Sequence, residues 1–140
     1  MSKLILGIVT ILALSVCSFS QVNSKDEKVK SATQSISTWL TVVDSGAYSK
    51  SCASTGSLFQ KQVSDSQWVD ALNKARKPFG SMISRSVKKA EYMTSLPGVP
   101  DGEYVVAVFQ TKFKKKKNAQ ETTTAVYEND SWKIVGYFIK

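Results

Sequence analysis

The amino-acid sequence predicts an α+β fold in which N-terminal helices pack on one face of a curved, four-stranded antiparallel sheet. Apolar residues recur at helical spacing in the first half of the chain and at a period of two from Met82 onward. Gly, Pro, Asn and Asp residues separate the period-two segments at short intervals, which favours strands that follow one another as a meander. Without an internal repeat or a long linker, we expect a single domain over residues 21–140.

Residues 1–20 have the pattern of a secretory signal peptide. Lys3 provides a positive charge, residues 4–16 form an apolar segment, and Ser18 and Ser20 are the small residues that a signal peptidase requires. The apolar segment is too short to cross a bilayer comfortably. We therefore expect cleavage before Gln21, an exported protein that is periplasmic or secreted, and no transmembrane helix in the mature chain.

A second processing route stays open at the same place. Leu14-Ser15-Val16-Cys17 is close to the motif after which bacterial lipoproteins are lipidated on cysteine. Val16 stands where that motif prefers a smaller residue, which argues against lipidation of Cys17. The two routes differ in whether the protein is free or anchored.

Three helices are predicted in the first half of the domain. Ser24 and Glu27 form a capping-box pattern that starts a helix from Lys25 to Val43, ended by Asp44-Ser45-Gly46. The apolar residues of this helix share one face: Val29, Ala32, Ile36, Leu40 and Val43.

A short second helix is expected around Ala47 to Ser54, before Gly56 interrupts it. The apolar residues Leu58 and Phe59 then cover the end of the core. Ser64 and Gln67 form another capping box, and the third helix that follows stops near Lys77-Pro78. The apolar positions of the third helix are Trp68, Leu72, Ala75 and Phe79.

The second half of the chain predicts four strands. The first begins at Met82, and a phase slip near Lys89-Ala90 predicts a bulge. Turn sequences at residues 97–102 lead into a second strand, whose residues 104–109 are apolar on both faces and therefore suit a central position. A lysine-rich turn leads to a third strand, Glu121 to Glu128, and a turn at residues 129–131 leads to a last strand, Trp132 to Ile139.

Composition limits the chemistry that the domain can perform. The chain has 19 Lys and Arg residues against 11 Asp and Glu residues, and it has no histidine. The mature domain, with a net charge of +7 once Lys3 is removed, is expected to attract anionic partners. Because histidine is the commonest general base and metal ligand, we expect no metal and no cofactor. Cys52 has no second cysteine to pair with in the mature domain.

Several ordered motifs connect the chain to a known family. They are Trp39-Leu40-x-x-Val43-Asp44-x-Gly46-x-Tyr48, Trp68 through Arg76-x-Pro78-x-Gly80, Ser84-Arg85, Leu96-Pro97-Gly98-x-Pro100-Asp101-Gly102-x-Tyr104, Phe113-x-x-Lys116-x-x-Ala119-x-Glu121-Thr122 and Trp132-x-x-x-Gly136-Tyr137. The sequence resembles the bacterial domain of unknown function 4019 family, exported proteins of uncharacterised role. Cys52 departs from the pattern, since an aromatic residue is usual there. The layout is also similar to the nuclear-transport-factor-2-like and cystatin-like folds, which implies a long helix across a curved sheet and a cone-shaped pocket.

Six residues are candidates for a pocket or anion-binding site, with structural explanations as the alternative. A catalytic set would use a carboxylate as base, an arginine as electrostatic clamp and a tyrosine as hydrogen-bond donor. The candidates are Asp44, Arg76, Arg85, Tyr92, Glu103 and Tyr104. A pocket enzyme requires that the carboxylate, arginine and tyrosine converge on one cavity. Asp44 equally suits a helix end, and Arg85 equally suits an ion pair on the sheet.

Five lysines fall within six residues at a predicted hairpin tip: Lys112, Lys114, Lys115, Lys116 and Lys117. We expect this tip to project away from the core, where it either protects a sheet edge from aggregation or binds polyanions. Only Phe113 supplies an aromatic ring for base stacking, which argues against nucleic acid. The interpretation that the residues favour is a non-enzymatic module of the cell envelope that binds a ligand, a protein partner or an anionic envelope component.

Overall fold

The computed structural model describes the backbone of residues 17–140 and the side chains from residue 24 onward. Most of the predicted leader, residues 1–20, lies outside the described residues, as does the side chain of Cys17. Within the described part, the element order is α1 (Cys17–Asp44), α2 (Tyr48–Ala53), α3 (Ser57–Gln62), α4 (Asp65–Ala75), the 3-10 helix η1 (Lys77–Phe79), β1 (Met82–Met93), β2 (Tyr104–Phe113), β3 (Ala119–Glu128) and β4 (Ser131–Ile139).

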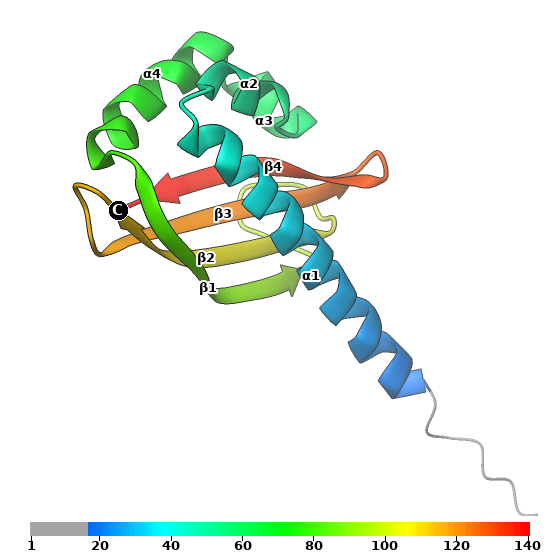
Figure 1. The fold of residues 1–140 in the computed structure, drawn as a ribbon. Helices are drawn as coiled ribbons and strands as arrows, with labels where there is room; N and C mark the ends of the chain where they lie inside the picture. The colour runs from blue at the N-terminus through cyan, green and yellow to red at the C-terminus, as the bar shows by residue number, and fades with distance from the viewer. Residues whose placement is uncertain (1–16) are drawn as a thin grey trace, which may run out of the picture.

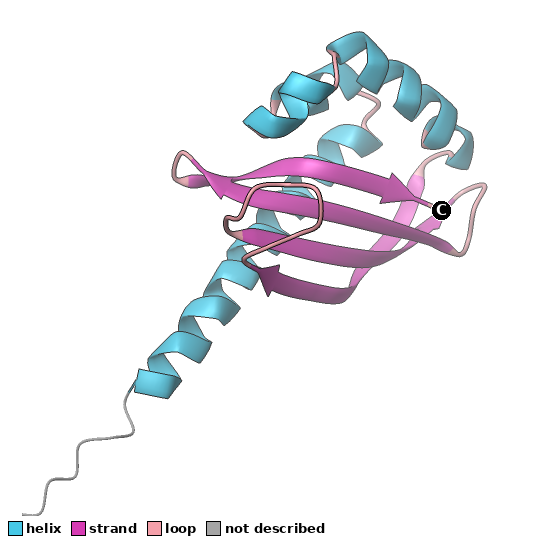
Figure 2. Cartoon of the chain, turned by 180° about the vertical axis from the view of Figure 1, so that it is seen from behind, coloured by secondary structure: helices cyan, strands magenta, loops and turns pink. Residues whose placement is uncertain are grey.

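The predicted fold class is confirmed. The four strands form one antiparallel sheet in the order β1-β2-β3-β4, with β2 between two neighbours as its two apolar faces predicted. Helix α1 crosses one face of the sheet, and α2, α3 and α4 gather beyond its C-terminal end (Figure 1). Figure 2 shows the opposite face of the sheet, on which none of the described helices lies.

The core lies between α1 and the sheet, and it follows from the two periodicities. Ala32, Ile36, Leu40 and Val43 are buried along one face of α1. On β2, residues at a period of two face the same core, where Val105, Ala107 and Phe109 are no more than 1% exposed. An aromatic cluster of Trp39, Trp68 and Tyr137 joins α1, α4 and β4, with ring centroids 5.5 to 6.2 Å apart.

A hydrogen-bonded serine fixes α2 against the longer helices. The Ser51 side chain is buried and accepts a hydrogen bond of 2.9 Å from Trp68 Nε1, while the Ser51 carbonyl accepts one of 2.9 Å from Trp39 Nε1. The buried N–H groups of both indole rings are therefore satisfied at one residue. This arrangement sets α2 in the angle between α1 and α4.

The sequence correctly predicted a helix cap, a hairpin turn and a bulge. Ser64 caps α4 through a complete capping box with Gln67. Asn129 and Asp130 have positive φ angles of 50° and 61°, as the two central residues of a tight hairpin require. The β1 bulge lies between Val87 and Lys89, next to the predicted phase slip.

Two predictions about the helices were wrong. Helix α1 begins at Cys17 and not at Lys25, so Ser24 lies inside the helix and does not cap it. Residues 17–23 contain no Gly or Pro, and nothing in them interrupts the helix before Ser24. Helix α3 was not predicted, although its Phe59 does cover the core as expected, with its ring centroid 5.3 Å from that of Trp68.

None of the described helices is long and apolar enough to cross a membrane.

Candidate functional site

A buried ionic network joins the end of α1 to the sheet. Arg85, from β1, donates two hydrogen bonds to Asp44 at the end of α1, of 2.7 and 2.9 Å. The same guanidinium donates bonds of 2.7 and 3.2 Å to Glu121 of β3. Arg76, at the C-terminal end of α4, donates a third bond of 3.1 Å to Asp44. Two arginines thus face two carboxylates, and the network has no net formal charge.

Two hydroxyl groups donate further hydrogen bonds to Glu121, whose side chain is fully buried. Thr111 of β2 and Tyr137 of β4 each donate a hydrogen bond of 2.6 Å to its carboxylate. Arg85, Thr111 and Tyr137 come from three different strands, and Glu121 lies on the third strand of the sheet, β3. A single carboxylate therefore ties together all four strands of the sheet.

Arg85 and Tyr137 both keep their protons in the folded protein at neutral pH. Burial alone would lower the pKa of Arg85, but its hydrogen bonds to Asp44 and Glu121 outweigh burial and raise the pKa above the ordinary value. Burial raises the pKa of Tyr137, and the charge of Glu121 and the hydrogen bond to it raise this pKa further. At neutral pH the Tyr137 hydroxyl therefore keeps its proton and donates a hydrogen bond to Glu121.

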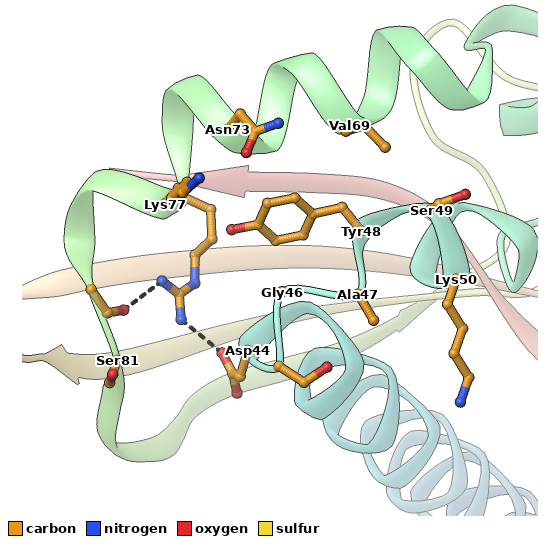
Figure 3. A pocket seen from close by; sticks show the side chains of 13 residues that line it. Asp44, Gly46, Ala47, Tyr48, Ser49, Lys50, Val69, Asn73, Lys77 and Ser81 are labelled. Atoms are coloured by element: carbon orange, nitrogen blue, oxygen red, sulfur yellow. Dashed lines mark hydrogen bonds and ion pairs between the residues drawn. The ribbon is translucent and has the colours of Figure 1, made fainter.

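An open pocket of about 750 Å³ lies beside this network. Asp44 and Arg76 form part of its wall, and the remaining lining comes from the α1–α2 connection, the start of α2, α4 and the segment that leads into β1. In Figure 3, Val69 and Asn73 project from α4 toward Tyr48 of α2, the Tyr48 ring points toward Lys77, and the Lys50 side chain extends from α2 away from this ring. The lining combines an apolar surface with hydroxyl, amide and ammonium groups.

Positive charge dominates the pocket. Lys50 and Lys77 are exposed, and neither forms an ion pair within the described part of the chain. Asp44 is the only carboxylate in the lining, and both arginines already bind it. Arg76 is only 3% exposed, and its Nε–H group has no acceptor among the described residues. A buried donor without a partner is unusual in proteins.

The structure divides the six predicted pocket residues among separate places. Asp44, Arg76 and Arg85 meet in the network, whereas Tyr92 lies seven residues beyond Arg85, about 23 Å along an extended strand. Glu103 pairs with Lys28 near the N-terminal part of α1, at 2.9 Å, and Lys28 lies 5.3 Å from the centre of the Tyr92 ring. The hydrogen bond to Glu103 raises the pKa of Lys28. Tyr104 donates a separate bond of 2.6 Å to the Pro100 carbonyl.

The carboxylate, arginine and tyrosine set that a pocket enzyme requires does not share one cavity. Both oxygens of Asp44 already accept hydrogen bonds from arginine, three in all, so most of the acceptor capacity of this carboxylate is occupied. Burial, and after it the charge of Asp65, raise the pKa of the Cys52 thiol, which keeps it in the unreactive protonated form. The described residues contain no group of three His, Cys, Asp or Glu side chains that could hold a metal ion.

Sequence reasoning missed three members of the network: Thr111, Glu121 and Tyr137. The signal for Glu121 was present, because it alternates with Thr123 and Ala125 on the buried face of β3. A glutamate at a core-facing strand position needs a cationic partner, and Arg85 is the arginine whose strand position brings it within reach.

The five lysines of residues 112–117 are all exposed, as expected. Their tip does not project freely, since its backbone bonds to the segment before β1.

The chain matches the model of a protein family. The family model described as a protein of unknown function (DUF4019) matches residues 35–137, a range that includes every member of the buried network. The comparison with curated proteins gave no match.

The buried network should dominate stability at this end of the domain. Replacing Glu121 by Gln leaves two buried arginines with one carboxylate, and we expect a loss of about 3–5 kcal/mol in the free energy of unfolding. Urea denaturation measures this loss. The control is Glu91→Gln, which breaks an exposed pair with Lys89 of 3.0 Å and should cost at most about 1 kcal/mol. Equal losses in the two variants would contradict a structural role for the network.

Tyr137 should make the protein less stable at alkaline pH. A tyrosine in the unfolded chain loses its proton near a pH of about 10, whereas Tyr137 keeps its proton above that pH in the folded state. The folded state then binds more protons than the unfolded state, so stability falls as pH rises past about 10.

The expected result for Tyr137→Phe is a shallower fall in the denaturation midpoint above that pH. Tyr127→Phe, at an exposed tyrosine, serves as the control and should follow the wild type. If all three proteins show the same pH dependence, burial beside Glu121 does not hold Tyr137 protonated.

Proposed function

Because the chain belongs to the DUF4019 family of proteins of unknown function, we propose its function from the site: a non-enzymatic, exported module that binds an anionic ligand in the pocket between α1, α2 and α4. The observation that carries the proposal is the pocket lining, in which Lys50 and Lys77 are exposed and form no ion pair within the described residues, while the single carboxylate, Asp44, is already bound by two arginines. Cations without partners in a concave site favour anionic ligands.

The remaining lining can contact more of a ligand than its anionic group alone. The volume of about 750 Å³ is within the range of small-molecule sites. Tyr48 and Val69 offer apolar contact area, while Asn73 and Ser81 offer hydrogen-bonding groups. A ligand that fills the pocket would carry an anionic group beside an apolar or ring-shaped part.

Binding without catalysis is supported by the state of the reactive groups. The chain has no histidine, the Asp44 carboxylate is occupied by arginine, and Cys52 is buried with a raised pKa. The space between α1 and the sheet is packed with core side chains such as Ile36 and Phe109. We infer from the long helix across the sheet a relationship to the nuclear-transport-factor-2-like or cystatin-like folds, but such folds carry enzymes and binding modules alike.

Inorganic phosphate is the simplest probe of the pocket. Calorimetric titration should show phosphate binding that weakens as ionic strength rises. Lys77→Ala and Lys50→Ala should each weaken it about tenfold, because each removes a charged donor. Lys61→Ala, at an exposed lysine of α3 outside this pocket, is the matched control and should bind like the wild type. Equal phosphate affinity in all four proteins would contradict the proposed site.

Export is a second part of the proposal, and it rests on the signal-peptide pattern of residues 1–20. The mass of the denatured protein, purified from the envelope of an expressing bacterium, tests it. A chain that begins at Gln21 is a free exported protein, and a chain that begins at an acylated Cys17 is a lipoprotein. A chain that retains residues 1–20 and stays in the cytoplasm would contradict export.

A further inference from the structure

The lysine hairpin, residues 114–117 between β2 and β3, is attached to the wall of the anion pocket. The backbone N–H of Lys114 donates to the Ser81 carbonyl at 2.8 Å, and that of Lys115 donates to the Phe79 carbonyl at 2.9 Å. Gly80 and Ser81 line the pocket on the other side of this segment. One short stretch of chain therefore separates the pocket from the hairpin.

Gly80 lies beside the hairpin in a backbone conformation that favours glycine. Its φ angle is +76°, a conformation that side-chain-bearing residues rarely adopt. A Cβ atom at this position would lie 3.5 Å from Lys114 Cβ and 3.5 Å from Lys115 Cγ. These are ordinary van der Waals distances, so the stems of two hairpin lysines lie beside Gly80, and its φ angle rather than a lack of space favours glycine here.

An aromatic pair connects the cations of the two sites. The rings of Phe79 and Phe113 meet edge to face, with centroids 5.6 Å apart. The Arg76 guanidinium lies 4.1 Å from the Phe113 centroid, and Lys116 Nζ lies 6.0 Å from the Phe79 centroid. Phe113 is fully buried and Phe79 is half-buried, so the pair holds the pocket and hairpin in a fixed relation.

Charge is separated between the two ends of the sheet. The lysine hairpin, Lys112 and Lys77 lie at the end where β2 leads into β3, and none of them forms an ion pair within the described residues. The carboxylates of the network at that end are neutralised by arginine. Carboxylates at the other end lie in the β1–β2 and β3–β4 connections or at the end of β3: Asp101, Glu103, Glu128 and Asp130.

We propose that the pocket and the lysine hairpin form one extended site for a linear polyanion, with one anionic unit in the pocket and the following units along the hairpin. This inference rests on the proposed function of the pocket. A flexible polymer suits the site better than a membrane surface does, because the hairpin exposes lysines without an apolar side chain to insert among lipids. Each additional unit that contacts a lysine adds a charge pair and releases counterions.

Linear polyphosphates of increasing length, compared with inorganic phosphate, test the proposal. The wild-type affinity should rise with chain length. In a variant with Lys114, Lys115, Lys116 and Lys117 changed to Gln, phosphate affinity should be unchanged and the gain with length should fall at least about tenfold. The control removes the same charge elsewhere by changing exposed Lys25, Lys30, Lys61 and Lys88 to Gln, and should retain the gain.

The outcomes separate the inference from the proposed function. Phosphate binding with an equal gain in the hairpin and control variants, or with no gain in the wild type, overturns the extended site alone. Absence of binding to both phosphate and polyphosphate overturns the pocket as well. Hairpin-dependent binding to phosphatidylglycerol vesicles, without a gain along the polyphosphate series, overturns the polymer in favour of a membrane surface.

Discussion

The position of the long helix α1 on the sheet depends on the hydrogen bonds of the Arg85 guanidinium. This group is shared between Asp44 at the end of α1 and Glu121 in the sheet, and it therefore fixes where the long helix ends above β1 and β3. Buried charges destabilise a protein unless they are paired and hydrogen-bonded. Here two arginines, two carboxylates and two hydroxyl groups satisfy this condition together, so that loss of any carboxylate leaves a buried positive charge.

The charge neutrality of this network determines which charges on the surface stay unpaired. Because Asp44 and Glu121 neutralise Arg76 and Arg85, they are not free to neutralise the lysines around them. The pocket beside α1 and the lysine hairpin consequently form one positively charged end of the domain. A structural network in the interior thus creates the conditions for the anion binding that we propose outside it, and none of its own members needs to act as an acid or a base.

The sequence predicted the features that depend on local chemistry. The capping box of α4, the order of the strands and the bulge in β1 each follow from a few neighbouring residues. The start of α1 was predicted wrongly, because a capping pattern at Ser24 competes with helix-permitting residues before it. The six residues of α3 carry too little periodicity to be recognised.

The site was harder to predict because its parts are distant in the chain. Asp44, Arg76 and Arg85 were each recognised as candidates, but a strand register is needed to show that Arg85 reaches Glu121, 36 residues away. The attachment of the lysine hairpin to Phe79 and Ser81 depends on where β1 begins relative to the end of β2. Periodicity identifies the faces of a strand, whereas only the three-dimensional pairing brings these two basic segments together.

The most direct test of this account is to locate a bound anion by nuclear magnetic resonance. Titration with inorganic phosphate should shift the amide signals of residues 45–50 and 76–81, which surround the pocket. The Nε–H signal of Arg85 should stay in place, because Glu121 holds that group. Shifts confined to the region of Lys28 and Glu103, or displacement of the Arg85 signal with the pocket amides unchanged, would contradict a site built beside an intact, self-neutralised network.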